Sequence, residues 1–226
     1  MGLFTPRRTL LSAGAFNGFT DWHSHILPGV DDGIRTMEDS LAVLAYFEQI
    51  GVQQVWCTPH IMEDMPNTPE ALKQRFEELG QAYSGPIALH LAAEHMLDPL
   101  FEERLASGQV MPVGPAGRQL LVETSYFNPP VRMDSMLREI RSKGFSPVLA
   151  HPERYNYMDT KDYERLHEDG IIFQLNIVAL SGGYGSHVQK KAQWMLDHGM
   201  YTYSGTDIHS LGQFKERINL KAKFTL

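Results

Sequence analysis

Histidine and carboxylate side chains that could bind metal ions are concentrated between residues 21 and 33 of this chain. His23 and His25 stand two positions apart, and Asp31 and Asp32 follow as adjacent carboxylates. In an extended segment, residues i and i+2 point to the same side, so the two imidazoles can converge on one point. Neutral imidazoles are common metal ligands, and carboxylates supply oxygen donors to divalent ions. Taken alone, the pair is equally well explained by histidines of a core or of a polar loop, so the rest of the chain must decide.

Residues of the same chemical types follow each later segment that resembles a strand. In chain order they are His60, Glu94, Glu123, His151, Asn176, Asp207 and His209. All of them can bind a metal, although Asn176 is the weaker ligand. Loops are polar in any protein, but that tendency does not predict His, Glu or Asp after nearly every strand. Because the carboxyl ends of parallel barrel strands meet on one face, residues far apart in the sequence can line one pocket.

Apolar strand-like runs alternate with helical patterns from Gly18 onward, which favours a parallel α/β architecture. Strands are expected from residue 18 and over 52–58, 86–93, 119–122, 147–150, 171–175 and 200–204. Helices are expected over 37–50, 69–83, 97–107, 131–143, 160–169 and 186–198. Residues 1–17 are expected to form an N-terminal extension outside the domain of residues 18–226, and they are a candidate contact in a homo-oligomer.

Composition limits the partners and the compartment of this 226-residue chain. It has 20 Lys and Arg against 27 Asp and Glu, and the net charge of -7 argues against nucleic acid or an anionic membrane as a partner. The single cysteine, Cys57, excludes an intrachain disulfide and fits a reducing compartment. No apolar run is long enough for membrane insertion. The apolar stretch within residues 7–15 is too short for a signal peptide, so we expect a cytoplasmic protein.

Five short motifs occur in an order that is typical of a known superfamily. They are HSHILPGVDDG at 23–33, TPH at 58–60, ETS at 123–125, HPERY at 151–155 and TDIH at 206–209. Over residues 18–212 the chain resembles the PHP superfamily of metal-dependent phosphoesterases, most closely its bacterial CpsB/YwqE-type protein-tyrosine phosphatases. The resemblance implies a distorted (β/α)7 TIM-like barrel with the metal site at the C-terminal ends of the strands. It also implies three divalent metal ions as cofactors, usually manganese, with iron, zinc or magnesium as alternatives.

The resemblance assigns nine residues to the three ions. The first ion is expected on His23, His25, Glu94 and Asp207, the second on Glu94, Glu123 and His151, and the third on Asp32, His60 and His209. Carboxylates such as Glu94 can bridge two cations, whereas imidazoles add affinity without adding charge. Asp31 is expected to support the site or its loop. Asp21 is expected to accept the second ring N–H of a histidine, with a simple strand-edge carboxylate as the alternative.

Arg154, three residues after His151, corresponds to a family arginine that binds phosphate, and a planar guanidinium suits bidentate phosphate recognition. A surface ion pair is the alternative. Family members carry a second arginine shortly after the D-x-H motif, and this chain has none in that register. Lys215 is the expected substitute in substrate binding, with Arg217 as the other candidate. His60 and His209 are the candidate general acids, provided that metal binding leaves one of them free.

The resulting hypothesis is hydrolysis of a phosphate monoester by water that the metal ions activate. The resemblance implies a phosphotyrosine protein substrate, the tail of a bacterial tyrosine kinase that controls capsular or extracellular polysaccharide synthesis. One alternative is another PHP phosphoesterase, such as a histidinol-phosphate phosphatase, and another is a weakly active, metal-holding protein that binds the kinase. A cysteine-dependent phosphatase is excluded, because Glu63 stands six residues after Cys57, where that mechanism needs an arginine.

Overall fold

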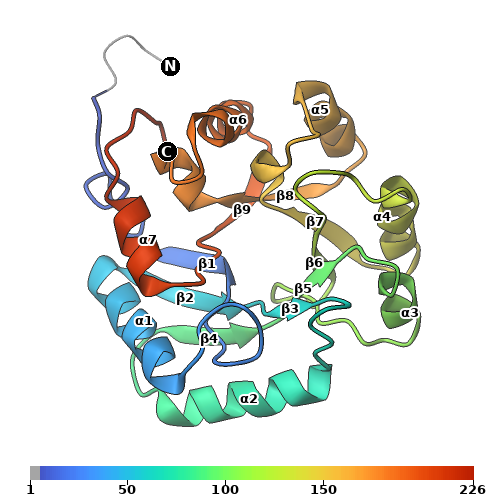
Figure 1. The fold of residues 1–226 in the computed structure, drawn as a ribbon, viewed down its shortest axis with the longest axis horizontal. Helices are drawn as coiled ribbons and strands as arrows, with labels where there is room; N and C mark the ends of the chain where they lie inside the picture. The colour runs from blue at the N-terminus through green and yellow to red at the C-terminus, as the bar shows by residue number, and fades with distance from the viewer. Residues whose placement is uncertain (1–5) are drawn as a thin grey trace.

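Strands and helices alternate along the chain in the computed structural model, which describes residues 6–226 (Figure 1). The strands are β1 (Phe19–Ser24), β2 (Val52–Cys57), β3 (His60–Ile61), β4 (Ala88–Leu91), β5 (Glu94–Met96), β6 (Gln119–Glu123), β7 (Ser146–Ala150), β8 (Ile172–Asn176) and β9 (Tyr201–Gly205). The helices are α1 (Met37–Ile50), α2 (Pro69–Ala82), α3 (Phe101–Ala106), α4 (Met133–Ser142), α5 (Thr160–Glu168), α6 (Ser186–Asp197) and α7 (Leu211–Ile218), with short 3-10 helices η1 (Pro152–Arg154) and η2 (Ile177–Ser181). The predicted parallel α/β architecture is confirmed, and α7 is an additional helix.

All strand pairs in the two sheets are parallel. The smaller sheet has the order β1-β2-β4, and the larger has the order β3-β5-β6-β7-β8-β9. Two backbone hydrogen bonds join β1 to the segment after β9. The Asp207 N–H donates to the His23 carbonyl at 2.8 Å, and the His25 N–H donates to the Ile208 carbonyl at 3.2 Å. The segments that follow the first and last strands are therefore neighbours.

Each of two predicted strands is followed, after a gap of two residues, by a short additional strand that begins at a predicted ligand. The second strand stops at Cys57, and the additional strand, β3, begins at His60. The third stops at Leu91, and the additional strand, β5, begins at Glu94. Pro59 has no N–H to donate to a neighbouring strand, but its carbonyl accepts the Glu94 N–H at 3.1 Å. His60 and Glu94 thus become direct partners across β3 and β5.

Local signals set both ends of α1. The Thr36 hydroxyl accepts the Asp39 N–H at 3.1 Å and caps the first turn. Gly51 ends the helix at φ 96°, in the left-handed region that glycine adopts without steric cost. Between these ends, Val43 and Phe47 are fully buried in the apolar core shared with β1 and β2. The helix is therefore fixed along the smaller sheet.

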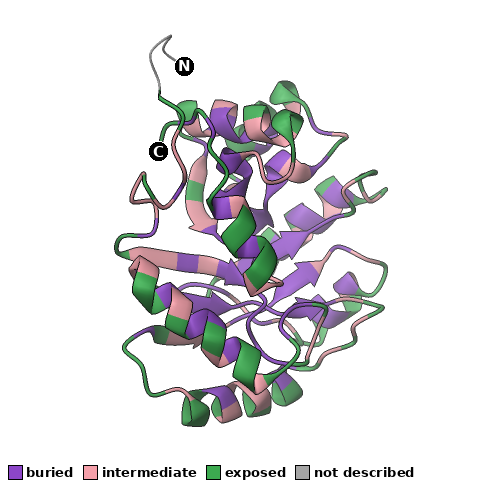
Figure 2. Ribbon diagram, turned by 60° about the vertical axis from the view of Figure 1, so that its left-hand side comes forward, coloured by how far each residue is buried: buried purple, intermediate pink, exposed green. Residues whose placement is uncertain are grey.

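The strands are mostly buried, whereas the outer faces of the helices are exposed (Figure 2). Buried residues fill most of β6, β7 and β8, whereas the helices carry exposed residues on their outer sides. Within residues 6–226, no helix combines the length and the apolar character needed to cross a membrane.

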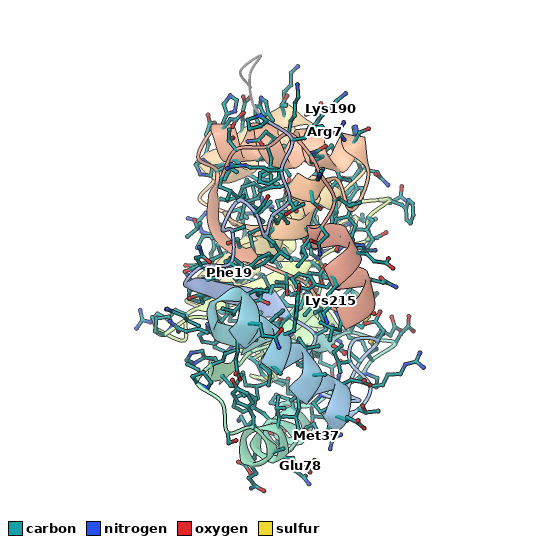
Figure 3. The ribbon with its side chains drawn as sticks, turned by 90° about the vertical axis from the view of Figure 1, so that its left-hand side faces the viewer. Arg7, Phe19, Met37, Glu78, Lys190 and Lys215 are labelled. Atoms are coloured by element: carbon teal, nitrogen blue, oxygen red, sulfur yellow. The ribbon has the colours of Figure 1, made fainter. Side chains whose placement is uncertain are left out.

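The described part of the N-terminal segment packs against the domain. Leu10 and Phe16 are buried in the apolar core, and the Leu10 N–H donates to the Ile218 carbonyl at 3.1 Å. Figure 3 shows the side of the molecule where Arg7 lies, and Nη2 of this residue donates to the Lys221 carbonyl at 3.0 Å. From residue 6 onward, the arm expected to lie outside the domain is part of its packing, because its apolar side chains are buried there.

Candidate metal and phosphate site

The nine predicted metal ligands come together in one cluster. They form four overlapping groups, and within each group the ligand atoms all lie within 4.8 Å of one another. The groups are His23, His25 and Asp207; His25, Asp32, His60 and His209; His23, Glu94 and His151; and His60, Glu94 and Glu123. The shared members join the groups, so the cluster collects side chains from stretches that are far apart in the sequence. His25 lies with the residues expected on the third ion as well as with those expected on the first.

Glu94 lies at the centre of this cluster and is fully buried. Its Oε2 atom is 3.1 Å from His23 Nε2 and 3.1 Å from His60 Nδ1. Its Oε1 atom is 3.1 Å from His151 Nε2. Burial alone would raise the pKa of Glu94, but the charges of His23 and His60 outweigh burial and hold this pKa well below its usual range. An ionised carboxylate that faces two ligand groups is placed as a bridging ligand would be.

The protonation of the histidines depends on the carboxylates around them. Burial alone would lower the pKa of His23, but the charges of Glu94 and Asp207 outweigh it and raise the pKa to about 9. The Nε2 atoms of His23 and His25 are only 3.0 Å apart, so the two rings face one point. A cation at that point would displace protons and satisfy both nitrogens.

Four polar atoms of the cluster are buried and have no hydrogen-bond partner within the described part of the chain. They are His60 Nδ1, Glu94 Oε2, Glu123 Oε1 and His151 Nδ1. Buried polar atoms are nearly always paired, so such atoms call for an explanation. Imidazole nitrogens together with carboxylate oxygens are a donor set that suits divalent transition metals. The residues present therefore fit divalent metal ions.

Two side chains orient the first pair of histidines. His23 Nδ1 lies 2.9 Å from Gln174 Oε1, and His25 Nδ1 lies 2.8 Å from Asp31 Oδ2. Both contacts turn Nε2 toward the cluster. Asp31 Oδ2 also accepts the His60 backbone N–H at 3.1 Å, in agreement with its expected supporting place. Sequence reasoning missed Gln174, although it precedes the predicted weak ligand of β8 by two positions and so shares its face of the strand.

The prediction that Asp21 accepts a histidine ring N–H is wrong. Its carboxylate instead accepts the Thr206 N–H at 2.8 Å, the Thr206 hydroxyl at 2.6 Å and the His23 backbone N–H at 3.2 Å. Asp21 therefore ties β1 to the segment after β9. Asn176 belongs to none of the ligand groups, and its amide donates to Asp207 Oδ2 at 3.0 Å. Asp21 and Asn176 therefore support the site through hydrogen bonds to Thr206 and to Asp207.

Backbone strain occurs at two of the predicted ligands. His151 (φ 35°) and Asp207 (φ 51°) are the only non-glycine residues with positive φ within residues 6–226. Such a conformation costs roughly 1–3 kcal/mol and persists only when the surroundings impose it. The His151 N–H donates to the Gln174 carbonyl at 2.8 Å, as the Asp207 N–H does to the His23 carbonyl. These hydrogen bonds to adjacent strands hold both side chains toward the cluster.

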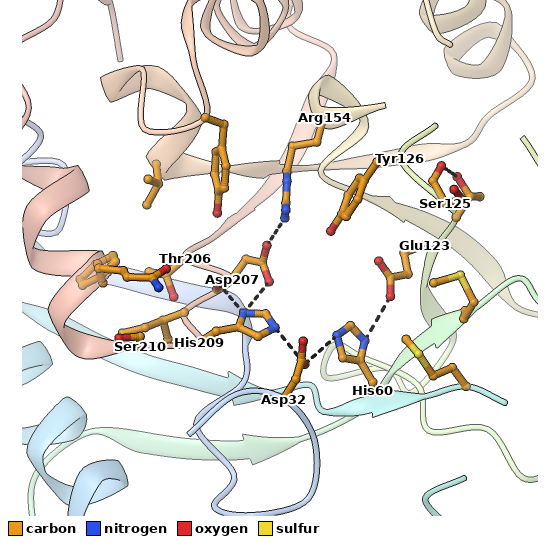
Figure 4. Close-up of a pocket in the computed structure, with 18 of the residues that line it drawn as sticks. Asp32, His60, Glu123, Ser125, Tyr126, Arg154, Thr206, Asp207, His209 and Ser210 are labelled. Carbon is orange, nitrogen blue, oxygen red and sulfur yellow. Dashed lines mark hydrogen bonds and ion pairs between the residues drawn. The ribbon is translucent and has the colours of Figure 1, made fainter. Parts of the chain in front are cut away.

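Arg154 connects the cluster to the cavity beside it. Its guanidinium donates to Asp207 Oδ2 and lies between two aromatic rings, with Cζ 4.4 Å from the centroids of both Tyr126 and Tyr184. Burial would lower the pKa of Arg154, but Asp207 outweighs it and raises this pKa, so the guanidinium stays charged. Figure 4 shows the interactions that continue from Asp207 through His209. The two tyrosines were not predicted as site residues.

The cavity has a volume of about 560 Å³, and Arg154 and Arg217 are both among its lining residues. Lys215 is not among them, which corrects the prediction for this residue. Its Nζ lies 4.3 Å from the centroid of the Tyr46 ring on α1, on the side that Figure 3 shows. Arg217 Cζ lies 4.7 Å from the Tyr184 ring. Residues two positions apart on a helix point about 200° apart, so only one of the two can face the cavity.

A comparison with known proteins agrees with this geometry. The family described as "Capsular polysaccharide synthesis, CpsB/CapC" matches residues 19–224, nearly the whole chain. The chain belongs to the CpsB/CapC family. One CpsB/CapC relative, the tyrosine-protein phosphatase CpsB of Streptococcus pneumoniae, is 29% identical over 204 residues, which cover 84% of this chain and 83% of that protein. The tyrosine-protein phosphatase YwqE of Bacillus subtilis is 24% identical over 197 residues, with 84% and 77% covered.

The fold of the CpsB/CapC family has been solved. A chain from the crystal structures of YwqE from Bacillus subtilis and CpsB from Streptococcus pneumoniae, described as unique metal-dependent tyrosine phosphatases, matches with a TM-score of 0.80. The identity is 23%, and the match covers 87% of this chain and 81% of that one. The mixed α/β fold with parallel sheets is therefore shared.

Proposed function

We propose that this chain is a metal-dependent protein-tyrosine phosphatase, a phosphoric monoester hydrolase that acts on phosphotyrosine. The observation that carries the proposal is the cluster of nine metal-binding side chains beside Arg154, at the wall of one cavity. Divalent cations and a guanidinium that face the same space suit a phosphate dianion. The names of the relatives CpsB and YwqE, both tyrosine-protein phosphatases, support the same chemistry.

The proposed cofactors are three divalent ions, with manganese as the first choice and iron, zinc or magnesium as alternatives. The ligand sets proposed from the family resemblance are His23, His25, Glu94 and Asp207; Glu94, Glu123 and His151; and Asp32, His60 and His209. In the structure, Glu94 lies in one group with His23 and His151 and in another with His60 and Glu123. When bound, such ions lower the pKa of water toward neutrality and offset the charge of the phosphoryl oxygens. The buried Glu94 carboxylate would be a ligand of two neighbouring ions, since its oxygens face different histidines.

Arg154 binds and orients the phosphate in this proposal. The rings of Tyr126 and Tyr184 already hold its guanidinium, so little side-chain freedom is lost when phosphate binds. Its pairing with Asp207 keeps it beside the cluster, where one phosphate can reach both. Arg217 supplies a second positive charge at the cavity wall and takes the place first expected for Lys215.

His209 is the proposed proton donor to the leaving group in the state of the site in which no ion binds its imidazole. Its side chain is 31% exposed and lines the cavity, whereas the His60 side chain is only 9% exposed and lies deeper in the cluster. A hydrogen bond from His209 lowers the pKa of Asp32 to about 2, so this carboxylate is ionised. The phenol of tyrosine has a pKa of about 10, so phenolate leaves more readily than an alkoxide.

The test compares metal-loaded and metal-free protein in one assay. Purified protein is analysed for its metal content and then assayed on p-nitrophenyl phosphate and on a phosphotyrosine peptide, with Mn²⁺ and after chelation. We expect turnover of both substrates with Mn²⁺ and a loss of about 100-fold or more after chelation. Equal rates with and without metal would contradict the metal-dependent mechanism.

The proposed physiological substrate is a phosphotyrosine segment of a bacterial tyrosine kinase that controls capsular or extracellular polysaccharide synthesis, and family membership supports it. Turnover of histidinol phosphate without turnover of phosphotyrosine peptide would favour the alternative PHP activity. The alternative of a weakly active kinase-binding protein depended on the absence of a second arginine. The presence of Arg217 in the cavity wall favours the enzyme.

The barrel closure, the domain bounds and the cellular location are also proposed. The strands close into a distorted (β/α)7 barrel, supported by the hydrogen bonds between β1 and the segment after β9. Residues 18–226 form the PHP domain, and residues 1–17 are its N-terminal extension, which packs against the domain from residue 6 onward. A cytoplasmic location is supported by Cys57, the single cysteine, which is buried as a free thiol.

A further inference from the structure

Only some of the apolar residues that line the cavity are accessible from it. Seven of its lining residues are large and apolar, namely Met62, Met65, Met96, Phe127, Val178, Ile208 and Phe214. Val178, Ile208 and Phe214 are only 2%, 2% and 3% exposed. The three methionines are partly exposed, and Phe127 is 71% exposed at the rim. We call Met62, Met65 and Met96 the methionine shelf.

Strand geometry makes the methionine shelf continuous with the metal cluster. Met62 and Met96 each follow a predicted ligand, His60 and Glu94, by two positions and so share its side of the chain. The register of β3 and β5 pairs His60 with Glu94 and Ile61 with His95, so Met62 and Met96 are the next residues along the two chains. Met96 is in turn the register partner of Glu123 on β6. The shelf therefore begins where the cluster ends.

The turn that carries Met62 and Met65 is held in place. The two residues exchange backbone hydrogen bonds of 3.2 and 3.1 Å. The Asn67 amide donates to the His60 and Val30 carbonyls, each at 2.9 Å. Figure 4 shows sulfur-bearing side chains on the side of Glu123 and His60. The backbone that carries Met62 and Met65 is thus held at the side of the cavity by hydrogen bonds to neighbouring segments.

The two tyrosines of the cavity are engaged elsewhere. The ring of Tyr126 packs on the Arg154 guanidinium, and the ring of Tyr184 contacts both Arg154 and Arg217. These rings belong to the phosphate-binding side. An organic group attached to a bound phosphate can meet accessible apolar surface at the methionine shelf and at Phe127.

We infer that the methionine shelf binds the aromatic ring of the substrate and makes the site selective for aryl over alkyl phosphate esters. This inference rests on the proposed function. Methionine sulfur is polarizable and makes favourable contacts with aromatic rings, and its flexible side chain adapts to a flat ligand. The shelf is thus a specificity determinant, separate from the residues that bind metal or phosphate.

The experiment measures binding of two phosphonates to the Mn²⁺-loaded protein by titration calorimetry. Phenylphosphonate and methylphosphonate present the same charged group with and without a ring. We expect the wild type to prefer phenylphosphonate by about tenfold or more, and M62A/M96A to reduce this preference to about twofold. M96L, which keeps an apolar side chain, retains most of the preference. M37A, a truncation of a partly buried methionine on α1, leaves it unchanged.

An unchanged preference in M62A/M96A overturns the inference, whether or not both phosphonates bind more weakly to that variant. Melting curves of the variants show whether they are folded, and M62Q/M96Q repeats the test with side chains of similar size. Absence of phosphotyrosine turnover in the same wild-type preparation overturns the proposed function instead. In that case the phosphonate preference still decides whether the methionine shelf binds a ring.

Discussion

The Arg154 guanidinium donates a hydrogen bond to the Asp207 carboxylate, which also lies in the ligand group of His23 and His25. Burial would raise the pKa of Asp207, but His23 and the other charges nearby outweigh it and keep this pKa well below its usual range. Arg154 is one of those charges. The proposed phosphate-binding residue and a proposed metal ligand thus form one ion pair, and substitutions on its two sides should have different effects.

Arg154→Lys tests the phosphate side of this pair. Lysine keeps the positive charge but loses the planar pair of donors and the stacking between two tyrosines, so we expect kcat/KM for phosphotyrosine peptide to fall about 100-fold. Metal content, measured by elemental analysis, should stay at the wild-type value. R165K is the matched control, because Arg165 pairs with Asp134 on an exposed surface. A loss of metal together with activity would show that Arg154 is structural.

Tyr184→Ala tests whether the ring holds the guanidinium in place. The ring contacts Arg154 and Arg217, so its removal frees both side chains, and we expect KM to rise about tenfold. Y184F keeps the ring and removes only the hydroxyl that accepts from the Asn176 amide at 2.9 Å. Steady-state kinetics of Y184F should therefore stay within about threefold of the wild type. Equal effects of the two substitutions would assign the role to the hydroxyl.

Asp31→Asn tests whether the Asp31 carboxylate orients the proposed metal ligands His25 and His60. Asp31 accepts from His25 Nδ1 and from the His60 backbone N–H, so its loss leaves both histidines less well oriented. We expect the affinity for Mn²⁺ to fall about 10- to 100-fold, as measured by competition with a chelating dye. D169N, a substitution of an exposed carboxylate at the end of α5, is the control. Unchanged affinity in D31N would limit Asp31 to a role in its loop.

The raised pKa of His23 predicts how pH affects the metal-free protein. This pKa is about 9 in the fold against an ordinary 6.5, so protonation of His23 stabilises the metal-free fold fully below pH 6.5, and the effect is lost as pH rises through 9. Metal must displace the same proton, so its affinity rises over that range. Calorimetric scans should show Tm falling with pH for metal-free protein, and the Tm increase caused by Mn²⁺ growing. An equal increase at pH 6.5 and 8.5 would contradict this prediction.

Arg217→Ala and Lys215→Ala form a matched pair on α7. Arg217 lines the cavity, whereas Lys215 packs over Tyr46, so only the first substitution removes a charge from the site. We expect kcat/KM for phosphotyrosine peptide to fall about tenfold in R217A and less than about twofold in K215A. The reverse order would restore the original prediction for Lys215.

The sequence by itself determined the types and the order of the ligand-bearing segments. The His23–His25 pair follows from strand alternation, and a single side chain such as Glu123 or His151 follows each later strand. The position of α1 was equally predictable, because Thr36 and Gly51 act within a few residues of their own place in the chain. Each of these features depends on contacts that are local in sequence.

Only the tertiary structure decided which side chains support the site. Gln174 reaches His23 across the sheet, whereas Asp21 bonds to Thr206 and not to a histidine ring. The choice between Lys215 and Arg217 likewise depended on how α7 is rotated against the rest of the fold. No local pattern carries this information, because the orientation of a helix or the partner of a buried carboxylate is set by packing between segments that are distant along the chain.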